Sequence, residues 1–166
     1  MLVNSSTPAW LRELGVRLVE GSVTSPERVA EAVEGVSEIY HLAGFVSHLA
    51  SDAHRMYSVH VDGTRLVCDA AVKAGVRRIV MASTSGTIAV SKREDDVADE
   101  SSQTPIDLIA RWPYYASKHY QEETARPPVA TESSWSPSTR ACSWARATIA
   151  SARRASWSSS WPATSC

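Results

Sequence analysis

Cysteine is too sparse in this sequence to build a disulfide framework or a metal site. Cys68, Cys142 and Cys166 are odd in number, lie far apart and form no Cys-x-x-Cys pair. Neither a set of disulfides nor a zinc centre is therefore expected. We expect a reduced protein without a metal cofactor.

Strong net charge and long apolar runs are also missing. The formal net charge is -1, which gives no electrostatic reason to bind nucleic acid or an anionic membrane. No apolar run approaches the roughly 20 residues needed to cross a bilayer. The first ten residues lack the charged and apolar regions of a signal peptide. We expect a cytoplasmic protein with neither nucleic acid nor membrane as a partner.

The sequence does contain strands that alternate with helices up to about residue 125. Short apolar runs at 16–19, 39–42 and 79–81 predict buried strands. Helical patterns precede Gly15, follow Pro26 and run from about 52 to 74. This alternation is typical of βαβ units and predicts an α/β fold with a parallel sheet.

Residues 78–122 contain the candidate chemistry. A strand ends in the hydroxyl cluster 83–85, and a later helix starts at Pro113 and carries Tyr114 and Lys118 on one face. An ammonium about 4 Å from a phenol, at an effective dielectric near 20, favours phenolate by about 4 kcal/mol. We therefore expect Lys118 to bring the pKa of Tyr114 down from about 10 toward neutrality. With a strand-end hydroxyl holding a substrate oxygen, this set suits the interconversion of a carbonyl and an alcohol.

A Tyr-x-x-x-Lys spacing alone is a weak signal, and a hydroxyl cluster after a strand is usually a turn. In this order, with Pro before Tyr and Ser before Lys, they resemble the extended short-chain dehydrogenase/reductase family, also called the NAD-dependent epimerase/dehydratase family. RIVMASTSGTIAV looks most like its dihydroflavonol-4-reductase-like branch. The resemblance covers about residues 6–125 and implies a partial doubly wound Rossmann sheet.

The resemblance implies an NAD(P)-dependent reductase that converts a ketone to an alcohol by hydride transfer. The second interpretation of the sequence is a nucleotide-sugar epimerase or dehydratase. The third is a non-catalytic protein with the dinucleotide-binding fold. NADPH is slightly favoured over NAD, and the substrate would be a small carbonyl compound or a sugar nucleotide. The resemblance leaves open whether the protein is a monomer or a homodimer.

By the same resemblance, Thr84 holds the substrate oxygen, Tyr114 donates the proton, and Lys118 binds the nicotinamide ribose. Ser22 replaces the usual adenine-binding acid of the family, and His60 replaces a usual Asn. The residues expected at the cofactor are Ser22, Val23, Leu42, Ala43, Gly44, His60, Tyr114 and Lys118.

Several neighbouring residues are given other roles. His41 is expected to be a packed strand residue, and Tyr115 and Tyr120 to be packing or rim residues. His119 and Glu122 are expected to face solvent or to cap the helix.

Both ends depart from the family pattern. The Gly-x-x-Gly-x-x-Gly loop that would hold the pyrophosphate is absent from the sequence. Met1 aligns near the end of the family's second strand. We therefore expect an N-terminally truncated domain that lacks its first strand and glycine loop and has little activity.

The composition changes near Arg126, which divides the chain into a partial Rossmann domain at 1–125 and a tail at 126–166. The tail contains eleven Ser and four Trp but no Leu, Gly, Asp or Lys, as expected of a low-complexity or disordered segment. We hypothesise that it is translated out of frame. One shifted reading from Ser138 gives Asn-Pro-x-x-x-x-Gly-Pro-Gly-Asp, which resembles the motif that follows the catalytic helix in this family. A genuine Ser/Ala/Arg/Trp linker is the alternative.

Overall fold

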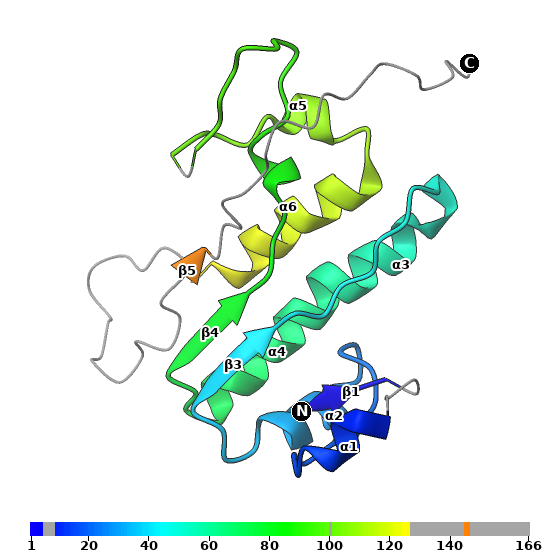
Figure 1. Cartoon of the computed structure of the whole chain (residues 1–166), viewed down its shortest axis with the longest axis vertical. Coiled ribbons are helices and arrows are strands. Elements are labelled where there is room, and N and C mark those ends of the chain that lie inside the picture. Colours follow the sequence, from blue (N-terminus) through cyan, green and yellow to red (C-terminus); the bar gives the residue numbers. More distant parts are fainter. Residues whose placement is uncertain (5–8, 100, 127–144, 147–166) are drawn as a thin grey trace.

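The computed structural model describes residues 1–4, 9–99, 101–126 and 145–146. Its strands run parallel in two sheets (Figure 1). In the first sheet β1 (Leu2–Val3) pairs with β2 (Val19–Glu20), and the second has the order β3 (Glu38–His41), β4 (Arg78–Met81), β5 (Ala145–Arg146). The predicted α/β fold with parallel strands is confirmed.

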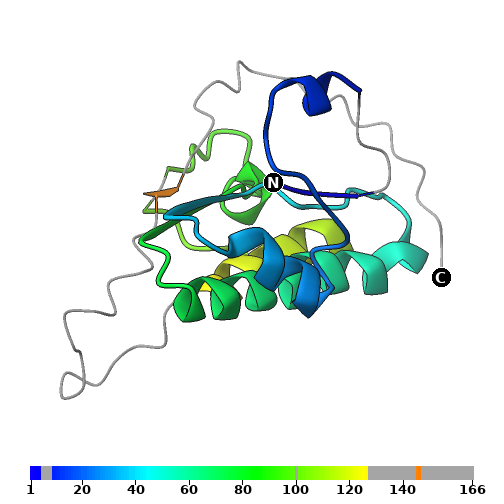
Figure 2. The ribbon, with the colours of Figure 1, turned by 90° about the horizontal axis from the view of Figure 1, so that it is seen from below.

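The helices form one main layer against these strands. Figure 2 shows α2, α3, α4 and α6 on one side of the strands and α1 on the other. In the described part of the chain none of them is long and apolar enough to span a bilayer. The helices are α1 (Ala9–Glu13), α2 (Pro26–Val33), α3 (Ala53–Tyr57), α4 (Gly63–Lys73), α5 (Ile106–Ile109) and α6 (Pro113–Ala125), with 3-10 turns η1 (Ala50–Asp52) and η3 (Ser85–Thr87).

The helix predicted over 52–74 forms, but with a wider turn in its middle. Between α3 and α4 lies the π-helical turn η2 (Ser58–Asp62). Single π turns inside α-helices shift the faces of the residues around them and are frequent at functional sites. Here His60 lies in the π turn and Thr64 in the first turn of α4, and both are fully buried.

One apolar cluster supports both sheets. Val23, Val29 and Val67 are buried together, and Leu2 from β1 and Ile39 from β3 pack against them. Burying a Val side chain contributes about 1.5–3 kcal/mol. The two sheets therefore share a core, although no hydrogen-bonded ladder joins β1 to β3 among the described residues.

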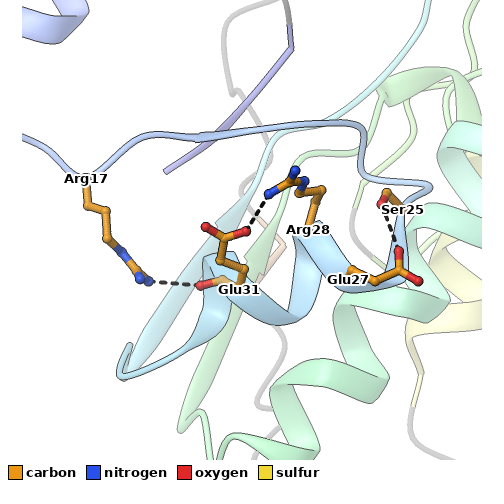
Figure 3. A network of polar contacts seen from close by, with 5 residues as sticks. All are labelled: Arg17, Ser25, Glu27, Arg28 and Glu31. Carbon is orange, nitrogen blue, oxygen red and sulfur yellow. Dashed lines mark hydrogen bonds and ion pairs between the residues drawn. The ribbon is translucent and has the colours of Figure 1, made fainter.

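Polar contacts hold the segment before β2 against helix α2 (Figure 3). The guanidinium of Arg17 donates to the backbone carbonyl oxygen of Glu31 at 2.9 Å. That carbonyl lies in the last turn of α2, where carbonyls lack intrahelical partners. On the same helix Arg28 pairs with the carboxylate of Glu31 at 2.8 Å, and Ser25 donates to Glu27 at 3.1 Å.

The strand predicted at 16–19 begins later than expected. β2 starts at Val19, because the ladder with β1 contains only the pairs Leu2 with Val19 and Val3 with Glu20. Val16 is 43% exposed and lies outside the ladder. The sequence pattern at 16–19 therefore predicted the strand correctly but gave it the wrong bounds.

The predicted division of the chain after residue 125 stays a prediction. Helix α6 ends at Ala125, one residue before the predicted change of composition. The short strand β5, which pairs with β4, was not predicted. Residues 127–144 and 147–166, including the start of the proposed out-of-frame motif at Ser138, lie outside the described residues.

Candidate functional site

Two strand ends form the edge on which the site is built. β3 and β4 are parallel and in register from Glu38 opposite Arg78 to His41 opposite Met81. The turns that follow, 42–44 and 82–84, therefore start at the same edge of the sheet. The Ala82 amide donates to the His41 carbonyl at 3.1 Å and continues the pairing one step further.

Helix α6 brings Tyr114 to the turn after β4. Pro113 occupies the first turn of α6, where a missing N–H costs nothing. The Thr84 side chain lies close enough to the Tyr114 phenol to lower its pKa. The backbone amide of Gly86 donates to the Thr84 hydroxyl oxygen at 3.2 Å and fixes its place in the turn. The two residues predicted to share a substrate oxygen are thus in contact.

The prediction that Lys118 brings the pKa of Tyr114 toward neutrality is wrong in this structure. Burial raises the Tyr114 pKa above its usual value of 10.0, the hydrogen bond with Thr84 lowers it, and the Tyr115 phenol raises it, with a net rise. Because its pKa is raised, Tyr114 is a protonated phenol at neutral pH.

Lys118 is buried, and the acceptors of its ammonium are not the phenol. Its side chain donates to the Ala82 carbonyl at 2.6 Å and to the Gln121 amide oxygen at 2.5 Å, and the residue is only 4% exposed. Burial lowers the pKa of Lys118 to about 8, and the nearby Glu122 carboxylate opposes that change. The ammonium charge is therefore largely kept at pH 7.

A chain of hydrogen bonds continues from Lys118 to β3. Gln121 donates from its amide nitrogen to the Thr64 hydroxyl at 3.0 Å, and that hydroxyl lies 2.8 Å from Nε2 of His41. Burial, helped by the charge of Lys118, lowers the pKa of His41 to about 4. His41 is thus a neutral, packed strand residue, as predicted.

His60 links the turn after β3 to helix α6. Its Nε2 accepts the Phe45 amide proton at 3.1 Å, and its Nδ1 lies 2.8 Å from the Ser117 hydroxyl. Since Nε2 is an acceptor, the ring proton must sit on Nδ1 and point to Ser117, which in turn donates to the Tyr114 carbonyl at 2.9 Å. The pKa of His60 is lowered to about 4 by burial and by the charges of Lys118 and His41. Its contact with a cofactor stays a prediction.

The remaining residues expected at the cofactor differ in exposure. Leu42 is 69% exposed and Gly44 is also exposed, while Ala43 is half-buried against the core. Val23 is a core residue, and the Ser22 hydroxyl lies 2.7 Å from that of Thr24 in the turn before α2.

Glu122 does not face solvent, so that prediction is wrong. It is 7% exposed, and its carboxylate accepts hydrogen bonds from Ser83 and, at 3.1 Å, from Thr87. Its position one turn beyond Lys118 on the same helix face was the available signal. For His119, Nδ1 is buried without a hydrogen-bond partner, so solvent does not reach that atom.

We expect the free energy of unfolding to fall as the pH drops from about 6.5 toward 4. The unfolded chain takes up protons at His41 and His60 in this range while the folded chain does not. Lowering a histidine pKa from 6.5 to about 4 corresponds to roughly 3 kcal/mol for each residue once the pH is below both values. Urea unfolding at a series of pH values measures this slope.

The variant His60→Asn is expected to remove about half of that slope, because Asn does not titrate. His54→Asn, at an exposed position of α3, is the matched control and should keep it. A free energy of unfolding that is equal at pH 7 and pH 4.5 in the unmodified chain would argue against two buried neutral histidines.

Comparison with known proteins identifies the family. Residues 3–126 match the 3-beta hydroxysteroid dehydrogenase/isomerase family. The chain belongs to this family. Membership confirms the predicted relation to extended short-chain dehydrogenases/reductases, a group whose members are NAD(P)-dependent oxidoreductases, epimerases and dehydratases.

One of the curated relatives described next is named as a reductase of the predicted dihydroflavonol-4-reductase-like branch. The chain is 36% identical over 86 residues to sterol demethylase protein B of Methylococcus capsulatus, covering 52% of this chain and 26% of that protein. It is 31% identical over 121 residues to a putative dihydroflavonol 4-reductase of Synechocystis, covering 73% and 34%.

Solved structures give the same fold. The dTDP-glucose 4,6-dehydratase DesIV of Streptomyces venezuelae, solved with NAD bound, is 28% identical with a TM-score of 0.58 over 75% of this chain and 40% of that one. The chain spans between about a quarter and just over a third of the length of the first curated relatives it matches. In the described part of the chain no group of three or more His, Cys, Asp or Glu residues could hold a metal ion.

Proposed function

We propose that this chain carries the proton-transfer half of an NAD(P)-dependent reductase that converts a ketone to an alcohol. The observation that supports it most is that the Thr84 side chain lies beside the Tyr114 phenol, close enough to lower its pKa, after the end of β4. A carbonyl oxygen between these two hydroxyls would be held by one and protonated by the other.

Tyr114 is protonated at neutral pH, which is the state that carbonyl reduction requires of its proton donor. A phenol that is protonated at neutral pH can donate a proton to a carbonyl oxygen, whereas oxidation of an alcohol needs a phenolate base. Lys118 keeps its charge near the strand end, where it would stabilise negative charge that develops on the substrate oxygen.

The residues present fit the nicotinamide end of the cofactor better than its adenine end. Leu42 and Gly44 are exposed at the carboxyl end of β3, which is where doubly wound sheets bind dinucleotides. At the adenine end the Ser22 hydroxyl is already paired with Thr24, and the sequence holds no glycine-rich loop. When bound, NAD(P)H supplies the hydride; Thr84 would hold the substrate oxygen, Tyr114 would protonate it, and Lys118 would bind the nicotinamide ribose. NADPH is the slightly favoured form.

The substrate class is a small ketone in a cytoplasmic enzyme. Relatives named as reductases of dihydroflavonol and vestitone support this choice. Similarity to DesIV, named as a dTDP-glucose 4,6-dehydratase, supports the second candidate, a sugar-nucleotide epimerase or dehydratase. That enzyme would use the same tyrosine, lysine and hydroxyl.

Cofactor binding and turnover by the 166-residue chain test the proposal. We expect weak nicotinamide binding by calorimetry at millimolar cofactor, and slow oxidation of NADPH that depends on added flavanonol or another ketone. The chain should purify without bound NAD. Co-purified NAD with turnover of UDP-sugars would favour the epimerase. No binding at millimolar NAD or NADPH would contradict both enzymes and leave a non-catalytic chain.

A further inference from the structure

A buried carboxylate on α6 connects to the loop that carries Thr84. Glu122 lies on the same face of α6 as Tyr114 and Lys118, at successive steps of four residues. Its Oε1 accepts one hydrogen bond from the Ser83 hydroxyl and one from Thr87. Burying a carboxylate costs free energy because the charge loses its water, unless hydrogen bonds replace that water. The bonds from Ser83 and Thr87 are therefore needed to keep the Glu122 carboxylate at its buried position.

The two residues that bind Glu122 flank Thr84 in the loop. Ser83 precedes Thr84, and Thr87 closes the η3 turn by donating from its amide and its hydroxyl to the Thr84 carbonyl, at 3.3 Å and 2.9 Å. Because the Thr87 hydroxyl has one proton, it shares that proton between the Thr84 carbonyl and Glu122. Thr84 is thus held between two residues that are both anchored to helix α6.

We propose that Glu122 is a positioning residue, whose carboxylate fixes the loop 83–87 on α6 so that the Thr84 hydroxyl meets the Tyr114 phenol. It acts through Ser83 and Thr87 and not on a substrate. The inference rests on the proposed function in one respect only, which is that the contact between Thr84 and Tyr114 is the one that matters for proton transfer.

Positioning can be separated from a direct effect of charge, because the two change Tyr114 in opposite directions. A negative charge near a phenol disfavours phenolate, so removing the Glu122 charge alone would lower the pKa of Tyr114. The Thr84 hydrogen bond lowers that pKa. Loss of the anchor would free Thr84, so positioning by Glu122 predicts a rise of the Tyr114 pKa when Glu122 is removed.

The experiment is a titration of the Tyr114 Cζ resonance in the full chain labelled with ring-13C tyrosine, with Tyr114→Phe to assign the signal. The variants are Thr84→Val, Glu122→Ala and the double variant Ser83→Ala/Thr87→Val, which removes the two donors and keeps the carboxylate. Glu123→Ala is the matched control, since Glu123 is a neighbouring exposed carboxylate paired with Arg126 at 2.8 Å.

We expect Ser83→Ala/Thr87→Val to raise the Tyr114 pKa by as much as Thr84→Val does. Glu122→Ala should raise it less, because loss of the carboxylate charge opposes the rise. Adding Glu122→Ala to Thr84→Val should raise it no further, and Glu123→Ala should leave it unchanged. If the double variant does not fold, because it leaves the buried Glu122 carboxylate without its two donors, Glu122→Ala reports on the same anchor with no buried charge left unpaired.

Two results would overturn the inference, and they differ in what else they contradict. If Thr84→Val raises the Tyr114 pKa while Ser83→Ala/Thr87→Val leaves it unchanged or lowers it, or while Glu122→Ala lowers it, the positioning role is wrong and the proposed function stands. If Thr84→Val itself has no effect, the pair is not coupled, and the proposed function fails together with this inference.

Discussion

Tyr114→Phe is expected to reduce kcat for carbonyl reduction by about 10²- to 10⁴-fold, the usual contribution of a positioned general acid. This corresponds to about 3–5 kcal/mol of lost transition-state stabilisation. The phenylalanine ring keeps the edge-to-face contact with His60, whose centroid lies 5.8 Å away, and loses only the proton donor and the bond with Thr84. Cofactor binding should therefore change little, so the loss appears in kcat and not in the dissociation constant.

Tyr115→Phe is the matched control for that variant. Tyr115 packs its ring on Gly86 and stands edge-to-face with Trp112 at 6.0 Å, so the ring itself is its structural contribution. We expect its kcat to stay within a few fold of the unmodified chain. Equal rates for Tyr114→Phe and the unmodified chain would show that the phenol takes no part in proton transfer.

Gly86→Ala is expected to destabilise the fold and displace the Thr84 loop. A Cβ at this position would lie 2.1 Å from Cε1 and 2.2 Å from Cδ1 of the Tyr115 ring, so the ring or the loop must move. Tyr115 also packs against Tyr114, with ring centroids 5.6 Å apart, so the displacement reaches the site. Overpacking of this kind costs about 1–3 kcal/mol, and urea unfolding with near-ultraviolet circular dichroism would record both effects.

Two further variants isolate the clash. Gly44→Ala is the control, because its nearest neighbour would be Nε2 of His60 at 3.4 Å, which is a tolerable contact. Combining Gly86→Ala with Tyr115→Ala removes the clash, so the double variant should be more stable than the sum of the two single effects. Additive effects would mean that the Tyr115 ring does not rest on Gly86.

The elements around the site were predictable because each carries a strong local signal. The apolar run at 79–81 lies within β4, which begins one residue earlier at Arg78, and Pro113 marks the start of α6 as expected. Their relative placement follows from parallel pairing, which puts the ends of β3 and β4 at one edge. Pairing does not fix where α6 packs, so the expectation that Thr84 and Tyr114 lie together came from the family resemblance.

The electrostatics of the site were not predictable from spacing. The four-residue step from Tyr114 to Lys118 says that they share a helix face, but not which acceptors the ammonium reaches. The Ala82 carbonyl and Gln121 bind it, and both contacts depend on tertiary packing. The burial of Glu122 has the same origin, since only the fold shows that Ser83 lies over α6.

The π turn and the pairing of β2 also depend on tertiary contacts. An apolar pattern places 52–74 on a helix, but the wider turn at 58–62 lets His60 reach both Phe45 and Ser117. Likewise Val16 fits a strand by composition, yet β1 offers no partner for it.

The most direct test of whether this chain performs the reduction follows a deuterium atom. NADPH carries the deuterium at the C4 position that is transferred, and the alcohol formed from the ketone is then analysed for it. Mass spectrometry of the alcohol detects turnovers too slow for an optical assay. With the 166-residue chain we predict one deuterium on the carbinol carbon, formed much more slowly with Tyr114→Phe. Alcohol without deuterium, or labelled alcohol formed at the same rate by both proteins, would contradict hydride transfer assisted by the Thr84–Tyr114 pair.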